Sequence, residues 1–151
     1  MPQPPPRSQT GEVLPHDHDE ILPDHGIIRR VSEKQVVKRA DGRRTLSTLA
    51  FKPSTSGEYP GLSVDIEDWI REANKEPKEF VTTPRWVGSV RFTAGALRHE
   101  ECRVGWDPLE KEGSLPANPF HGEVWDIDRE KQTRLQEIAA WYVPIAGVDV
   151  R

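Results

Sequence analysis

The sequence predicts an α+β domain: a mixed or mostly antiparallel sheet, two main helices packed on it, and a disordered N-terminal tail. From residue 26 onward, several segments alternate between apolar and polar residues, as strands do. Helical periodicity is strong in only two segments, 65–74 and 128–143. Because these segments do not follow one another as regular βαβ units, a doubly wound parallel sheet is not expected.

The first 22 residues differ in composition from the rest of the 151-residue chain. Prolines at positions 2, 4, 5, 6 and 15 prevent regular pairing, and few large apolar side chains accompany them. The five tryptophans all follow residue 60, where each can bury on the order of 200 Å². We therefore expect a disordered proline-rich tail over 1–22 and a single domain over 23–151.

The boundaries of several elements follow from turn and capping residues. Strands are predicted at 26–31, 45–51, 86–92, 102–106 and 120–127, with a short strand or helix lead-in at 62–64. The first two are expected to pair as a hairpin, and residues 32–37 form either a short helix or an extended piece. Thr93 is expected to cap a single helical turn, and Asp128 caps the last helix, which runs to about Val143.

Composition excludes several classes of protein. The formal net charge of −4 gives no overall attraction to nucleic acid or to an anionic membrane. Cys102 is the single cysteine, so neither an intrachain disulfide nor a paired-cysteine zinc site can form. The chain has no signal-peptide pattern and no apolar run long enough to span a membrane, so a cytoplasmic location is expected. No nucleotide-binding glycine motif is present, and no cofactor is predicted.

Two charged stretches remain as candidate binding regions. Seven lysines and arginines lie between residues 29 and 44, where a solvated surface is the simpler interpretation and nucleic-acid binding is the alternative. His16, His18 and His25, with nearby carboxylates, are ligand types that zinc or nickel accepts. A metal site needs ligands held by surrounding structure, and a disordered tail would not provide it, so no metal site is predicted.

The candidate catalytic residues are Arg29, Arg30, His121 and Glu123. His121 and Glu123 lie two residues apart on one predicted strand and therefore share a face. They could form an acid–base pair in a cleft. The favoured interpretation puts both side chains on the solvent face, opposite Phe120, Gly122 and Val124.

A more specific enzyme hypothesis combines two of these candidate positions with a serine-rich segment. Arg29 or Arg30 lies in a first strand, Ser54-Thr-Ser56 follows Phe51, and Glu123 lies in a late strand. This order resembles ADP-ribosyltransferase toxins, which carry an arginine, a Ser-Thr-Ser and a glutamate on successive strands. The resemblance implies that the arginine holds the phosphates of a nicotinamide dinucleotide and that the glutamate orients the acceptor. His121 stands where that family carries the first residue of a Glu-x-Glu pair, and Ser54 lies in a predicted loop.

Four short segments also resemble a group of small uncharacterised bacterial proteins. They are Leu22-Pro-Asp-His-Gly-Ile-Ile-Arg29, Leu49-Ala-Phe51 with Gly61-Leu-Ser-Val64, Val104-Gly-Trp-Asp-Pro-Leu109, and Asn118-Pro-Phe-His-Gly-Glu-Val124. The resemblance covers about residues 22–140 and implies a single domain of bacterial origin. It brings no activity, ligand or catalytic residue with it.

The leading functional hypothesis is a non-enzymatic protein-interaction module of a bacterial cytoplasmic system. Trp141 and Tyr142 are its candidate binding residues, because two neighbours on a helix cannot both face the core. The alternative is a small enzyme acting on a nucleotide or nucleic-acid substrate through the Arg29/Arg30 strand and the His121/Glu123 strand. Convergence of these side chains at a concave pocket would favour the enzyme.

Overall fold

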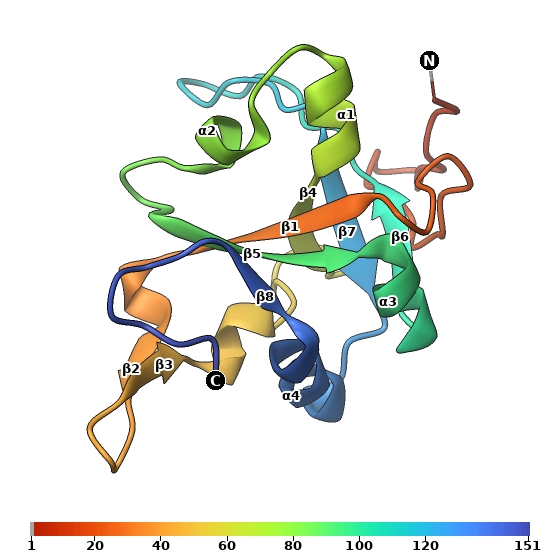
Figure 1. Ribbon diagram of the computed structural model, residues 1–151. Coiled ribbons are helices and arrows are strands. Elements are labelled where there is room, and N and C mark those ends of the chain that lie inside the picture. The colour runs from red at the N-terminus through yellow and green to blue at the C-terminus, as the bar shows by residue number, and fades with distance from the viewer. Residues whose placement is uncertain (1) are drawn as a thin grey trace.

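The computed structural model describes residues 2–151 and has the predicted α+β architecture, built on one antiparallel sheet (Figure 1). Its six strands lie in the order β6-β7-β4-β1-β5-β8. They are β1 (Gly26–Val31), β4 (Leu62–Ile66), β5 (Gly88–Thr93), β6 (Arg103–Trp106), β7 (His121–Trp125) and β8 (Ala140–Val143). A separate small hairpin pairs β2 (Val36–Lys38) with β3 (Arg44–Leu46).

Helices cover both faces of the sheet. On one face, α1 (Glu67–Glu72) and α2 (Pro77–Val81) pack over β1 through a small cluster of Ile28, Ile70 and Val81. On the other face lies the main core, to which α3 (Ala94–His99), α4 (Arg129–Ile138) and the 3-10 helix η2 (Thr48–Phe51) contribute. A further 3-10 turn, η1 (Glu33–Gln35), precedes β2. None of the helices in residues 2–151 is long and apolar enough to cross a bilayer.

Local capping chemistry defines the starts of two helices, as the sequence predicts. The Thr93 hydroxyl accepts a hydrogen bond from the Ala96 amide at 3.1 Å, which begins α3. The Asp128 carboxylate accepts one from the Lys131 amide at 2.8 Å, which begins α4. In both cases a side-chain oxygen satisfies an amide that has no partner within the helix.

Two predictions are wrong, one about a strand pairing and one about the end of a helix. Residues 26–31 do not form a hairpin with 45–51, because β1 lies between β4 and β5 and residues 48–51 form η2. The last helix ends at Ile138 rather than Val143, and residues 140–143 form β8 at the edge of β5. The open edge of β5 supplies backbone partners that overrule the helical periodicity of this segment.

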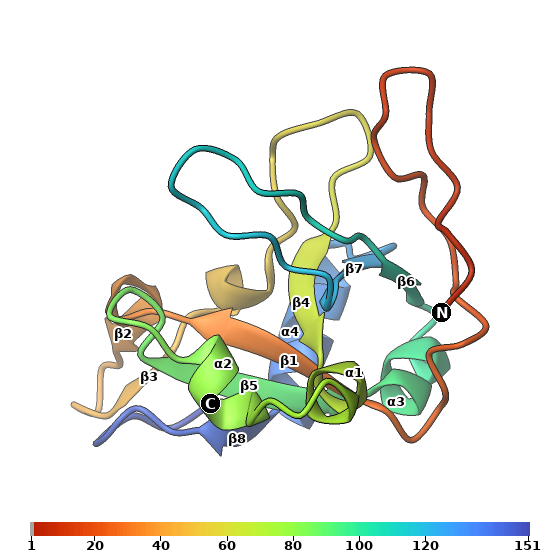
Figure 2. The same cartoon turned by 90° about the horizontal axis from the view of Figure 1, so that it is seen from above.

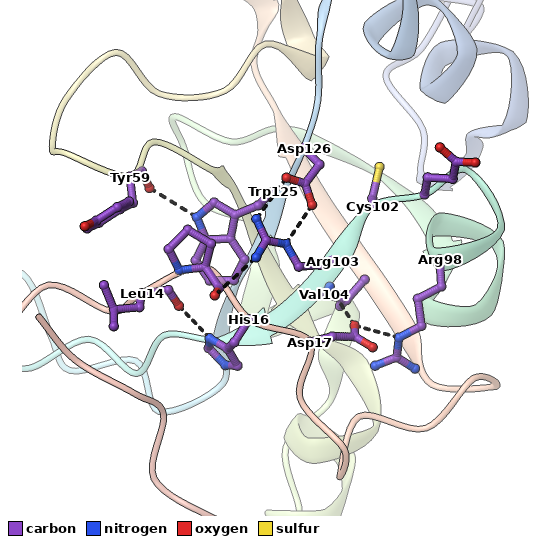
Figure 3. A network of polar contacts seen from close by, with 12 residues as sticks. Leu14, His16, Asp17, Tyr59, Arg98, Cys102, Arg103, Val104, Trp125 and Asp126 are labelled. Carbon is purple, nitrogen blue, oxygen red and sulfur yellow. Dashed lines mark hydrogen bonds and ion pairs between the residues drawn. The ribbon is translucent and has the colours of Figure 1, made fainter.

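The N-terminal segment is an ordered arm, not the disordered tail that its prolines predict (Figure 3). The His18 amide donates to the Val104 carbonyl at 2.9 Å, and the Asp17 carboxylate accepts from the Val104 amide at 3.0 Å. The ring of His16 accepts from the Trp106 amide at 3.1 Å. Val13 and His18 are buried. The arm therefore packs along the edge strand β6, whose outer backbone groups it hydrogen-bonds.

Three long connections project on the same side of the sheet (Figure 2). They are the tip of the N-terminal arm, the segment between η2 and β4, and the segment between β6 and β7. The first two are joined, because the Glu12 carboxylate accepts hydrogen bonds from the amides of Glu58 and Tyr59 at 3.1 and 3.0 Å. Segments that lie far apart in the sequence thus form one rim.

Deletion of residues 2–20 should destabilise the domain. We expect the free energy of unfolding to fall by about 2 kcal/mol or more, because burial of Val13 alone contributes about 1.5–3 kcal/mol. Urea denaturation followed by tryptophan fluorescence measures the change. Gln9→Ala, at the exposed tip of the arm, is the control and should leave the midpoint unchanged. An unchanged midpoint in the deletion variant would show that the arm does not stabilise the domain.

Candidate active site

The register of β4 with β7 brings four polar side chains onto one face of the sheet. Asp65 of β4 pairs with His121 of β7, and Ser63 pairs with Glu123. Directly paired residues point to the same side, and residues two apart on a strand share that side. Ile28 also pairs with Asp65, so the polar residues lie on the face that carries α1 and α2.

Arg29 reaches this group through an opening in the sheet. The ladder between β1 and β4 contains only two pairs, Ile27 with Ile66 and Ile28 with Asp65. At the next residue of β1, Arg29 donates from Nη1 to the Ser63 carbonyl at 3.0 Å and from Nε to the Ala50 carbonyl at 2.9 Å. Burial lowers the pKa of Arg29 to about 10, while the Glu123 and Asp65 carboxylates oppose the shift. The guanidinium therefore stays protonated at neutral pH.

Glu123 is the most perturbed acid of the site. Its side chain is 15% exposed, and its Oε2 atom is buried without a hydrogen-bond partner in residues 2–151. Burial, together with the neighbouring Asp107 carboxylate, raises the pKa of Glu123 to about 8, and the Arg29 charge opposes the rise. A carboxyl group that titrates near neutral pH inside a cavity is typical of a functional site.

His121 lies between the two acids, with its side chain 10% exposed. Its Nδ1 is 2.7 Å from the Asp107 carbonyl oxygen, which fixes the ring and makes Nδ1 the protonated nitrogen of the neutral form. Nε2 lies 3.9 Å from Oε1 of Glu123. Ligand atoms of Asp107, His121 and Glu123 all lie within 4.8 Å of one another, so the set could act in proton transfer or hold a divalent cation.

Two adjoining cavities open onto these groups. The larger, of about 330 Å³, is lined by Ser63, His121 and Glu123 and by the three projecting connections. The smaller, of about 180 Å³, is lined by Arg29, Ser63 and His121. Gly61 leaves the space that the carboxylate occupies, since a side chain there would collide with Glu123 and with the Trp125 indole. The larger cavity has a volume typical of a small-molecule site.

Arg30, the next residue of β1, is held in an ion pair and differs in this from Arg29. Arg30 donates to both carboxylate oxygens of Asp65, from Nε at 2.8 Å and from Nη2 at 3.2 Å. Asp65 also accepts from the Asn118 side chain at 2.9 Å, which ties the end of the β6–β7 connection to the sheet. With its charge paired, Arg30 holds the site together, and Arg29 is the arginine that remains available to a ligand.

The structure therefore brings together Arg29, His121 and Glu123 from the predicted set. The favoured interpretation put His121 and Glu123 on the solvent face, and this is wrong. The projecting connections cover their face of the sheet. Ser54 and Ser56 line the larger cavity from a loop, and the strand serine beside Glu123 is Ser63. The basic stretch is divided, with Arg43 paired to Asp41 at 3.0 Å and Arg44 to Glu33 at 3.2 Å.

The three N-terminal histidines are engaged by the backbone. The His16 ring contacts the backbone of Leu14 and Trp106, and the His18 ring contacts the backbone of Gln3 and Glu20. The His25 ring contacts the backbone amide of Leu22. These contacts occupy both ring nitrogens of His16 and His18 and the Nδ1 atom of His25. The arm that carries the histidines is fixed by them.

Trp141 and Tyr142 are both partly buried, on opposite faces of the sheet. The Trp141 indole donates to the Val148 carbonyl at 3.1 Å and packs against the main core. Tyr142 packs against the cluster under α1 and α2, and the Lys78 ammonium lies 5.2 Å from its ring centre. Their role as binding residues stays a prediction.

Sequence reasoning did not identify Ser63 and Asp107. Ser63 would have required the pairing of β4 with β7, and Asp107 the pairing of β6 with β7. The available signal was local: Ser63 alternates with the apolar residues Leu62 and Val64, as a polar side chain on the second face of a strand does.

No protein-family model, curated protein or solved structure matches the chain. The resemblance to a group of bacterial proteins consequently stays a prediction, and function has to be argued from the site.

Glu123→Gln should stabilise the protein at alkaline pH. Because the folded state holds the Glu123 proton up to about pH 8, the wild type loses stability relative to the variant as pH rises from about 4.5 to about 8. The loss is at most about 1.4 kcal/mol per pH unit and levels off above pH 8. Melting temperatures of the two proteins between pH 5 and pH 9 test this. Glu110→Gln, at an exposed site, should show no pH-dependent difference from the wild type, and a Glu123→Gln difference that does not grow with pH would contradict the prediction.

Proposed function

We propose that the protein is a small enzyme that transfers an ADP-ribosyl group from a nicotinamide dinucleotide. The observation that carries the proposal is the meeting of Arg29, Ser63 and Glu123, from three neighbouring strands, at two adjoining cavities. The resemblance to ADP-ribosyltransferases calls for an arginine, a Ser-Thr-Ser and a glutamate on successive strands, and this site offers the arginine, a single serine and the glutamate. The strand serine is Ser63, in place of the loop residues Ser54 and Ser56.

The reaction breaks one bond and forms another at the same carbon. The bond between the ribose C1′ atom and the nicotinamide nitrogen breaks, and nicotinamide leaves with the electron pair as a neutral molecule. C1′ then bonds to the oxygen or nitrogen of an acceptor, which loses a proton. Positive charge develops on the ribose in the transition state, so a fixed carboxylate beside it lowers the barrier.

The residues of the site suit the parts of such a substrate. Arg29 uses Nε and Nη1 on backbone carbonyls, which leaves Nη2 without a partner in residues 2–151 and available to a phosphate oxygen. Because its pKa is about 8, Glu123 ionises as the pH rises through that value, and the ionised carboxylate stabilises the ribose charge or accepts the acceptor's proton. The Ser63 hydroxyl lines both cavities beside Glu123, where it can orient a ribose hydroxyl. His121 Nε2 lies 3.9 Å from the Glu123 carboxylate, a distance at which a proton passes between them through one water molecule.

The cytoplasmic location expected from the sequence suits this proposal, because nicotinamide dinucleotides are abundant there. A partner protein is the natural acceptor for the group, and water replaces it in the simplest assay. The leading hypothesis from the sequence was protein interaction. Under this proposal, the interaction would bring the acceptor protein to the enzyme.

The test measures nicotinamide release from NAD⁺ and from NADP⁺ by the full chain, with water as acceptor. At pH 8.5, where Glu123 is largely ionised, we expect Glu123→Gln to lower the rate about 10²–10³-fold, since it removes a charge that acts in the transition state. Arg29→Lys should act mainly through KM, because lysine lacks the fixed planar donors of arginine. Glu110→Gln should match the wild type.

Three outcomes would contradict the proposal. One is a wild type that releases no nicotinamide from either dinucleotide, and another is equal release by the wild type and Glu123→Gln. The third is loss of the reaction on addition of EDTA, which would assign Asp107, His121 and Glu123 to a catalytic cation instead.

A further inference from the structure

A third cavity, of about 720 Å³, shares no lining residue with the two cavities of the candidate active site. Its walls are aromatic: Trp69 comes from α1, Trp106 ends β6, and Phe120 immediately precedes β7. The Trp69 and Trp106 rings meet edge to face, with their centres 5.5 Å apart. The Trp106 indole is held by a 2.8 Å hydrogen bond to the Pro119 carbonyl, so this wall is preorganised.

The rim of this cavity is acidic. Asp19, Glu20 and Glu72 line it, and no lysine or arginine does. None of the three carboxylates forms an ion pair with any residue in the described part of the chain. Glu20 accepts a hydrogen bond from the Gln3 amide, and that contact leaves its charge uncompensated.

We propose that this cavity binds an arginine side chain presented by a partner protein. A guanidinium is attracted by the faces of tryptophan and phenylalanine and forms strong hydrogen bonds with carboxylates. Arginine suits the site better than lysine, because its planar group is weakly hydrated and stacks on aromatic rings. An anion would be repelled at this rim, and a neutral apolar group would cover the carboxylates without pairing them.

The surroundings of the cavity favour a peptide segment over a free cation. Leu22 lines the cavity and is 48% exposed, so it offers apolar contact to residues that flank the arginine. Aromatic anchors surrounded by polar residues are typical of protein interfaces. This surface uses Trp69 and Trp106, whereas the sequence had indicated Trp141 and Tyr142.

The proposal does not rest on the activity proposed above, but the two sites are connected by the chain. Trp106 is followed directly by Asp107, and Phe120 by His121. A segment bound between Trp106 and Phe120 would therefore contact the same backbone that positions two polar residues of the active site. An enzyme that modifies a protein partner could use such a surface to hold it.

The experiment titrates the full-length protein with the blocked tripeptide acetyl-Gly-Arg-Gly-amide and follows the five indole N–H signals by NMR. We expect the Trp69 and Trp106 signals to shift and to saturate in the millimolar range. Acetyl-Gly-Lys-Gly-amide should bind several-fold more weakly, and acetyl-Gly-Glu-Gly-amide should cause no saturable shift. No dinucleotide is present, so the result is independent of the transfer assay.

Two variants and one control assign the contact. Glu72→Gln, at an exposed position, and Trp69→Leu, at an aromatic wall, should each weaken binding about fivefold or more. Glu79→Gln, on the neighbouring helix and outside the cavity, should not change it. Equal binding of the arginine and glutamate peptides, unchanged affinity in Glu72→Gln, or no shift at tens of millimolar peptide would each overturn the proposal. Because Glu72→Gln does not disturb the core, the test holds even where Trp69→Leu lowers stability.

Discussion

The early end of the ladder between β1 and β4 is the constraint on which the candidate active site depends. Beyond Ile28 and Asp65 the two strands no longer pair, which leaves the Ser63 carbonyl without a strand partner. The Arg29 guanidinium takes that carbonyl, and a buried charge of this kind is tolerated only where hydrogen bonds and an opposite charge compensate it. Glu123, placed beside Ser63 by the β4–β7 register, provides an opposite charge once it ionises, and the nearby Asp65 carboxylate adds a second one. The pairing of the strands thus determines where the charged groups of the site lie.

Features fixed by neighbouring residues were predictable from the sequence. Thr93 and Asp128 cap their helices because a side-chain oxygen reaches an amide only a few residues away. The segment 140–143 was not predictable in this way, since it continues a helical pattern and becomes a strand only when the edge of β5 is available. The N-terminal arm is a similar case. Its prolines prevent regular structure, yet His16, Asp17 and His18 find partners along β6 that no local pattern reveals.

The candidate site was predictable in part for the same reason. The alternation of β7 correctly separates His121 and Glu123 from Gly122 and Val124, because side chains on a strand point alternately to two faces. Alternation cannot say whether the polar face meets solvent. Here it meets a rim built from the arm, the segment before β4 and the segment before β7, and these come from three distant parts of the chain. Ser63 and Asp107 join the site through the same long-range contacts.

Glu123 is the clearest conflict between folding and any function of this site. A carboxyl group with a buried, unpartnered oxygen next to a second acid costs stability, and a glutamine of the same shape would avoid that cost. Conflicts of this kind persist where the group has a task, because catalysis needs a charge that is poorly solvated before the substrate arrives. The arm, seated on β6 and joined through Glu12 to the segment before β4, helps to exclude water from Glu123. The burial of Val13 and His18, two residues of the arm, therefore supports the environment that perturbs this carboxylate as well as the fold itself.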